Sequence, residues 1–154
     1  AGLRIHECFR IDTAAAERAL RENVLTVKGK GGKVRTVPIE DERIPMMLRK
    51  LLVQTRRGHK LLVPDGMPTD RAINALELFI YRYRNEVSDE GSDRCLTFHG
   101  LRHTYAAEKY TRLTEDGMSA IDAHYAVSRL LGHERADVTN IYLASVRKRG
   151  RDGE

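Results

Sequence analysis

Residues 24–39 read VLTVKGKGGKVRTVPI, and this stretch decides the fold of the first half of the chain. Two runs rich in β-branched residues flank an interruption at Gly31 and Gly32, which is the pattern of an antiparallel hairpin. Pro38 suits the end or edge of a strand because it has no N–H to donate to a partner strand. We therefore predict a β-hairpin over residues 23–39, with Lys30 at its turn.

The chain after the hairpin is predicted to be mostly helical. Apolar residues recur there every three or four positions, the period of an amphipathic helix. The segments that show this period are 44–52, 73–87, 99–111, 120–131 and, as a last short helix, 138–145. Gly132 stands where a helix C-terminus favours glycine, and a loop is predicted at 64–68. The fold class is therefore α+β: one mostly helical domain with a small antiparallel sheet.

The first ten residues carry no N-capping signal, and apolar residues begin at Leu3 and Ile5. We predict that residues 1–10 form the end of a helix that starts before Ala1. At 154 residues the chain has the size of a single domain.

The composition favours an anionic partner. Lys and Arg number 27 against 22 Asp and Glu, for a net charge of +5, and nucleic acid is the commonest partner of such a basic protein. Cys8 and Cys95 are isolated, which argues against a zinc ribbon or a disulfide framework and favours a reducing cytosol. No apolar run approaches the roughly 20 residues that span a bilayer.

Several short motifs carry possible chemistry, although each has an ordinary structural explanation. His99 and Arg102 lie three residues apart on a predicted helix, where an imidazole and a guanidinium can grip a phosphate. His133 precedes Tyr142 by nine residues, but a single tyrosine on an amphipathic helix usually packs in a core. Lys30 could belong to a solvated basic turn.

Taken in order, these segments resemble the catalytic signature of the tyrosine recombinase (phage integrase) family. The opening GLRIHE resembles the segment of the first catalytic arginine, and VKGKGGKVRTVPI resembles the hairpin of the catalytic lysine. FHGLRHTYA resembles the H-x-x-R box, and LLGHERADVTNIY resembles the last box, which contains the nucleophile. The resemblance runs from Gly2 to about Leu143. It implies the catalytic-core fold of these DNA breaking and rejoining enzymes.

The resemblance also implies a role for each residue. Tyr142 would attack the scissile phosphorus and form a 3′-phosphotyrosyl bond, while Arg4 and Arg102 clamp the non-bridging oxygens. Lys30 would protonate the 5′ oxygen that leaves, with Lys28 and Lys33 as nearby rivals.

Two histidines and one carboxylate complete the implied site. His99 would assist proton transfer at the tyrosine, and His133 would hydrogen-bond the phosphate. Glu7 would hold Arg4 in place from behind. The other five tyrosines (Tyr81, Tyr83, Tyr105, Tyr110 and Tyr125) are predicted to serve packing, and His103 to be structural.

The family resemblance further implies a metal-independent reaction without cofactor, small-molecule substrate or membrane association. The partner is double-stranded DNA, on which family members assemble as tetramers, and the location is the cytoplasm. Residues 1–154 would be a C-terminal catalytic domain that lacks its first helix and an N-terminal DNA-binding domain. The stretch 114–126 is longer and more acidic than the family pattern predicts.

Three other functions share some of these features. A type IB topoisomerase uses similar Tyr, Arg and Lys chemistry to relax DNA, and a DNA-binding module without catalysis would keep the basic surface. A metalloenzyme could use His99, His103 and His133, but the H-E-x-x-H glutamate is missing and Arg102 would repel a cation. Residues 29–34 do not fit a Walker phosphate loop.

Overall fold

The structure, a computed structural model, describes residues 1–87 and 95–132. By its internal contacts the chain divides into two compact units. The first unit comprises Ala1 and residues Leu3–Phe98, and the second comprises Gly2 and the residues from His99 onward.

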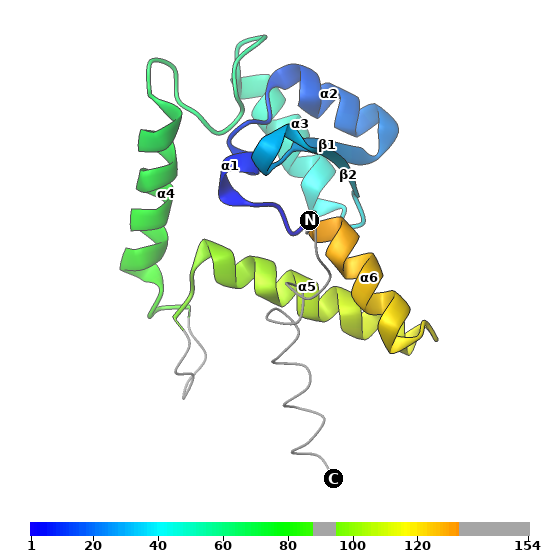
Figure 1. Ribbon diagram of the computed structural model, residues 1–154. Coiled ribbons are helices and arrows are strands. Elements are labelled where there is room, and N and C mark those ends of the chain that lie inside the picture. The colour runs from blue at the N-terminus through cyan, green and yellow to red at the C-terminus, as the bar shows by residue number, and fades with distance from the viewer. Residues whose placement is uncertain (88–94, 133–154) are drawn as a thin grey trace. The chain divides into compact units, whose positions relative to one another are not determined.

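The first unit contains the sheet and most of the helices (Figure 1). Its elements are α1 (Ile5–Cys8), α2 (Thr13–Glu22), β1 (Val24–Lys28), the 3₁₀ turn η1 (Lys30–Gly32), β2 (Val34–Pro38), α3 (Arg43–Gln54) and α4 (Thr69–Tyr83).

The predicted β-hairpin is confirmed. β1 and β2 pair antiparallel, with Val24 opposite Pro38 and Lys28 opposite Val34, so Pro38 ends its strand as expected. In the turn, Gly31 and Gly32 have φ angles of 70° and 79°. Side chains disfavour this left-handed region, which is why the chain reverses at two glycines.

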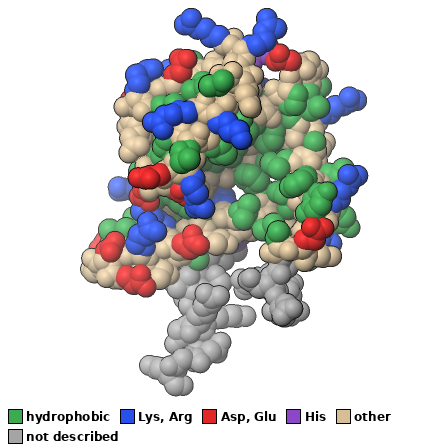
Figure 2. Space-filling model, turned by 180° about the vertical axis from the view of Figure 1, so that it is seen from behind, with side chains coloured by type: hydrophobic (Ala, Val, Ile, Leu, Met, Phe, Trp, Pro, Cys, Tyr) green, Lys and Arg blue, Asp and Glu red, His purple; other side chains and the backbone are tan. Residues whose placement is uncertain are grey.

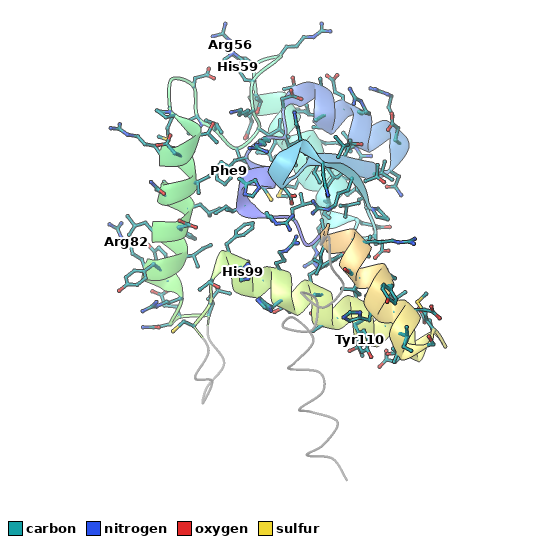
Figure 3. The ribbon with its side chains drawn as sticks, in the orientation of Figure 1. Phe9, Arg56, His59, Arg82, His99 and Tyr110 are labelled. Atoms are coloured by element: carbon teal, nitrogen blue, oxygen red, sulfur yellow. The ribbon has the colours of Figure 1, made fainter. Side chains whose placement is uncertain are left out.

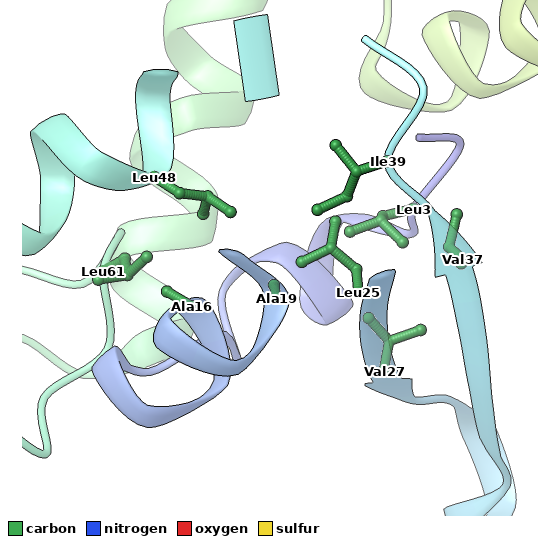
Figure 4. Packing of buried hydrophobic residues seen from close by; sticks show 9 residues of the cluster. All are labelled: Leu3, Ala16, Ala19, Leu25, Val27, Val37, Ile39, Leu48 and Leu61. Atoms are coloured by element: carbon green, nitrogen blue, oxygen red, sulfur yellow. The ribbon is translucent and has the colours of Figure 1, made fainter. Parts of the chain in front are cut away.

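The core of the first unit lies between the hairpin and the helices α2 and α3 (Figure 4). Alternate residues of the strands point inward, as the period of two requires. Small side chains of α2 allow the helix to approach the sheet closely. The buried residues are Leu3, Ala16, Ala19, Leu25, Val27, Val37, Ile39, Leu48 and Leu61.

The prediction for residues 1–10 is wrong. Helix α1 is four residues long and has a start of its own, because the backbone N–H of Arg4 donates to Glu7 Oε2 at 2.7 Å. A glutamate at the third helical position that reaches back to the N-cap is half of a capping box. Arginine is not a usual N-cap residue, so the sequence pattern did not show this start.

Helix α2 occupies a segment for which we made no prediction. Its buried residues all have small side chains: Thr13, Ala16 and Ala19. The start is nevertheless well defined, since Asp12 accepts a hydrogen bond from the backbone of Ala15 at 2.7 Å.

The two other predicted helices of this unit are confirmed with shifted ends. Helix α3 covers the predicted segment 44–52. Helix α4 begins earlier than predicted, at Thr69, and ends at Tyr83, so Val87 lies outside it and is exposed. The loop at 64–68 is also confirmed.

The second unit contains α5 (Phe98–Glu115) and α6 (Ala120–Leu131), which diverge from the turn that joins them in Figure 1. Its core is formed by Ala106, Val127 and Leu131, with Tyr110 packed against them. Both predicted helices are confirmed, and the stretch 114–126 includes the turn between them.

Helix α6 has clear signals at both ends. Ser119 accepts a hydrogen bond from the backbone N–H of Asp122 at 3.1 Å, and Gly132 ends the helix with a φ of 64°. The helix predicted at 138–145 lies outside the described residues. Among the described helices, none is long and apolar enough to cross a membrane.

Candidate active site

Glu7 is the centre of the predicted site residues in the first unit. Its side chain has no exposed surface, and both of its oxygens accept hydrogen bonds from Arg4. The backbone N–H of Arg4 donates to Oε2 at 2.7 Å, and its Nη1 donates to Oε1 at 3.3 Å. The expected contact between Glu7 and Arg4 is therefore present.

Arg35, in strand β2, is a further partner of Glu7 that the sequence analysis missed. Its Nη1 donates to Oε1, and its Nη2 donates to Oε2 at 3.0 Å. Two parallel bonds of this kind are the strongest arrangement between a guanidinium and a carboxylate. A signal for this residue existed: Arg35 occupies the same face of the strand as the buried Val37, and an inward arginine needs a buried anion.

The two arginines determine the protonation of Glu7. Burial by itself raises the pKa of Glu7, but the hydrogen bonds from the Arg35 side chain and the Arg4 backbone outweigh it and lower the pKa to about 2. The carboxylate is therefore charged at neutral pH. Two guanidinium cations around one carboxylate leave an excess of one positive charge in the cluster.

The turn of the hairpin lies directly beside this cluster. Gly29 is buried, and a Cβ placed on it would lie 3.4 Å from Glu7 Oε1 and 3.8 Å from Arg4 Nη1. The turn is closed by a hydrogen bond from Gly29 N to the carbonyl of Lys33 at 2.8 Å. The first unit therefore brings Gly29, the residue before Lys30, next to the Arg4–Glu7 pair. The side chain of Lys30 lies outside the described part of the structure.

His99 lies in the first turn of α5 and is exposed (Figure 3). Its ring is 4.7 Å from that of His103, with the two planes nearly perpendicular at 84°. This contact is the i, i+4 neighbourhood on which the metal hypothesis rested. Among residues 1–87 and 95–132, no group of three potential ligands could hold a metal ion.

Arg102, unlike His99, is buried, with only 3% of its surface exposed. Its Nη1 donates to the carbonyl of Gly2, and its Nη2 donates to the carbonyl of Leu131 at 2.5 Å. Leu131 is the last residue of α6, where carbonyl groups have no partner within the helix. Arg102 therefore organises the second unit by holding the end of α6 and the backbone of Gly2.

The remaining predicted residues, His133 and Tyr142, lie outside the described residues. Of the five other tyrosines, Tyr105 and Tyr110 pack against the core of the second unit, as predicted. The packing prediction is wrong for the other three, which are exposed: Tyr81, Tyr83 and Tyr125.

Basic side chains are distributed rather than concentrated on the face seen in Figure 2. Lys and Arg alternate there with apolar groups and some carboxylates.

Comparison with known proteins identifies the family. The model of the phage integrase family matches residues 1–149. Tyrosine recombinase XerD of Pseudomonas putida is 30% identical over 148 residues, which cover 92% of this chain and 45% of the relative. Tyrosine recombinase XerC of Mesorhizobium japonicum is 31% identical over 150 residues, which cover 92% of this chain and 42% of the relative.

A solved structure agrees at the level of the fold. The crystal structure of XerA recombinase superposes with a TM-score of 0.67 at 21% identity, over 98% of this chain and 53% of that one. The chain spans about half the length of the curated relatives it matches. From its sequence and its fold, the chain belongs to the phage integrase family of tyrosine recombinases.

Proposed function

We propose that this chain is the catalytic domain of a site-specific DNA recombinase that cuts and rejoins strands through a 3′-phosphotyrosyl intermediate at Tyr142. The observation that carries the proposal is the buried Glu7 carboxylate shared by two arginines, directly beside the hairpin turn of Lys30. This cluster holds an excess positive charge at a fixed position, which suits an anionic phosphoryl group.

The reaction is a pair of transesterifications. The phenolic oxygen of Tyr142 attacks the scissile phosphorus, a phosphorus–oxygen bond to tyrosine forms, and the bond to the 5′ oxygen breaks. Lys30 gives its proton to the departing 5′ oxygen, and His99 assists removal of the tyrosine proton. In the second step a 5′ hydroxyl attacks the phosphotyrosine and releases Tyr142, so the reaction needs no external energy source.

The arginines stabilise the charge that develops on the non-bridging oxygens. Arg4 is the more accessible cation of its cluster, since 30% of its side chain is exposed. Arg102 is almost fully covered and is bonded to two carbonyls. Its contact with phosphate therefore requires a local change in the Gly2–Arg102–Leu131 bonds when DNA binds. His133 would add a hydrogen bond to the same phosphate.

No metal ion is needed in this scheme because the guanidinium groups supply the positive charge. We also propose that target sequence is read by a separate DNA-binding domain, that the enzyme acts as a tetramer, and that it works on DNA in the cytoplasm. Phosphate contacts of the kind described here position DNA without reading its sequence.

The test is covalent capture on DNA. The full-length protein is incubated with a randomised pool of nicked duplexes, in which the cleaved end diffuses away and traps the intermediate. We expect a denaturant-resistant protein–DNA adduct whose nucleotide maps to Tyr142 and which Tyr142→Phe does not form. An equal adduct with Tyr142→Phe would show that another nucleophile acts.

Two other outcomes identify the alternatives. Binding of the duplex pool without any adduct would make the chain a DNA-binding module. Relaxation of supercoiled plasmid by the protein alone, without exchange of strands between duplexes, would favour topoisomerase chemistry.

A further inference from the structure

We propose that Arg35 is a positioning residue that fixes Arg4 through the buried Glu7 carboxylate. The inference rests on the proposed function, in which Arg4 contacts the scissile phosphate. Arg35 is separated from Glu7 by 28 positions in the chain, yet it binds both carboxylate oxygens.

The hydrogen bonds among Arg35, Glu7 and Arg4 explain how Arg35 can fix the position of the Arg4 side chain. The planar fork of Arg35 holds the plane of the Glu7 carboxylate through two bonds. The same two oxygens then accept from Arg4, one from its backbone N–H at 2.7 Å and one from its Nη1 at 3.3 Å. The orientation of the carboxylate thus sets both the start of α1 and the direction of the Arg4 side chain.

Burial separates the roles of the two arginines. Only 13% of the Arg35 side chain is exposed, against 30% for Arg4. Arg35 is thus the inner cation and Arg4 the outer one. A phosphate that approaches from solvent therefore meets Arg4, while Arg35 acts from behind it.

The positive charge of Arg35 also neutralises the buried Glu7 carboxylate. A buried carboxylate is costly unless a cation stays beside it. If Arg4 were the sole partner of Glu7, a phosphate bound to its guanidinium would compete with Glu7 for the one positive charge. Arg35 keeps the carboxylate neutralised even when Arg4, held in place, shares its charge with a phosphate.

The same contact joins the two elements that carry catalytic groups in this unit. Arg35 lies opposite Val27 in the hairpin, and the turn of that hairpin contains Lys30. Glu7 lies in α1, which begins directly after Arg4. The Arg35–Glu7 pair therefore holds the segment of the first arginine against the hairpin of the lysine.

The test is the single-turnover rate of adduct formation on nicked duplex at saturating DNA, with the full-length protein. Four forms are compared: wild type, Arg4→Ala, Arg35→Gln and the double variant. We expect Arg35→Gln to lower the rate on the order of 10- to 100-fold, because small misplacements of a catalytic group cost this much. In the Arg4→Ala background, Arg35→Gln should lower the single-turnover rate by less than about threefold, because the guanidinium that Arg35 positions is already absent.

Two further measurements exclude a merely structural effect. The Kd for the duplex should be unchanged by Arg35→Gln, so that the loss is confined to the chemical step. Arg18→Gln, which removes an exposed arginine of α2 in the same unit, should leave the rate at the wild-type value.

If Arg35→Gln does not fold, a second variant tests the same proposal. The double change Glu7→Gln and Arg35→Gln removes both buried charges and leaves two amides that can bond each other. We expect this variant to fold, by circular dichroism, and to react as slowly as Arg35→Gln is expected to. A folded double variant with the wild-type rate would overturn the proposal.

The outcomes distinguish this inference from the proposed function. If Arg35→Gln lowers the rate equally with and without Arg4, Arg35 acts independently of Arg4 and the inference is wrong while the recombinase assignment stands. If Arg4→Ala itself leaves the rate unchanged, or the wild type forms no adduct, the proposed role of Arg4 fails and the inference fails with it.

Discussion

The guanidinium of Arg102 donates from Nη2 to the carbonyl oxygen of Leu131, 2.5 Å away, and thereby joins α5 to the last residue of α6. The same side chain donates to Gly2. A nearly fully buried cation is costly unless hydrogen bonds compensate for the lost water, and the two carbonyl oxygens supply such bonds to Nη1 and Nη2. Arg102 is therefore a structural centre of the second unit as well as a candidate for phosphate binding.

Replacement of Arg102 should destabilise the protein. Arg102→Ala leaves the two carbonyl groups without this donor, which we expect to lower the free energy of unfolding by about 3 kcal/mol. Arg102→Lys keeps the charge but cannot reproduce the fork, so its loss should be intermediate. Urea denaturation measures both. Arg112→Gln, at an exposed position of the same helix, is the control and should change stability little.

The charged state of Glu7 should make stability depend on acid pH. Its pKa is about 2 in the folded protein and returns to 4.5 on unfolding. A lowered pKa stabilises the fold fully above pH 4.5, and this contribution is lost as the pH falls toward 2. The loss is at most about 3–4 kcal/mol, at about 1.36 kcal/mol per pKa unit. Glu7→Gln should remove this part of the pH dependence in urea titrations.

Asp41 provides a matched control for Glu7. Hydrogen bonds from the Arg43 side chain and backbone also lower the pKa of Asp41 to about 2, but this pair lies at the surface. Water and salt screen such a pair. Asp41→Asn should therefore change acid stability much less than Glu7→Gln, and high salt should abolish its effect. Equal effects of the two substitutions would contradict the role of burial.

Gly2 should not tolerate a side chain. Its φ is +59°, and an added Cβ would lie 2.3 Å from Cδ1 of Tyr105. Gly117 has a φ of +91° with nothing within 4 Å of its Cβ position, so it reports the backbone strain alone. We expect Gly117→Ala to cost about 1 kcal/mol of stability and Gly2→Ala about 1–3 kcal/mol more. Thermal denaturation of both variants compares them directly, and equal losses would exclude the clash.

Lys30 is expected to act as the acid for the leaving oxygen. Lys30→Ala should slow cleavage of ordinary DNA by about 10²- to 10⁴-fold. A duplex with sulfur in place of the bridging 5′ oxygen should restore the rate, because a thiolate leaves without a proton. Lys28→Ala and Lys33→Ala are the matched controls. If one of them shows the sulfur rescue instead, the general acid is that lysine.

Local structure was largely predictable from the sequence. The hairpin over 24–39 follows from a period of two interrupted by glycines, and α6 follows from a period of 3.6 that ends at Gly132. These signals arise within a few residues of each other, so the sequence shows them directly. The motifs around Arg4, Lys30 and Arg102 are local in the same sense.

The sequence by itself thus determined the hairpin, most helices and the family. Only the tertiary structure decided which charges meet. Arg35 and Glu7 are 28 positions apart, and their pairing depends on how β2 packs against α1. The burial of Arg102 likewise depends on carbonyls supplied by Gly2 and Leu131, 100 and 29 positions away. Side-chain spacing cannot show such contacts, because they form only when distant segments share one core.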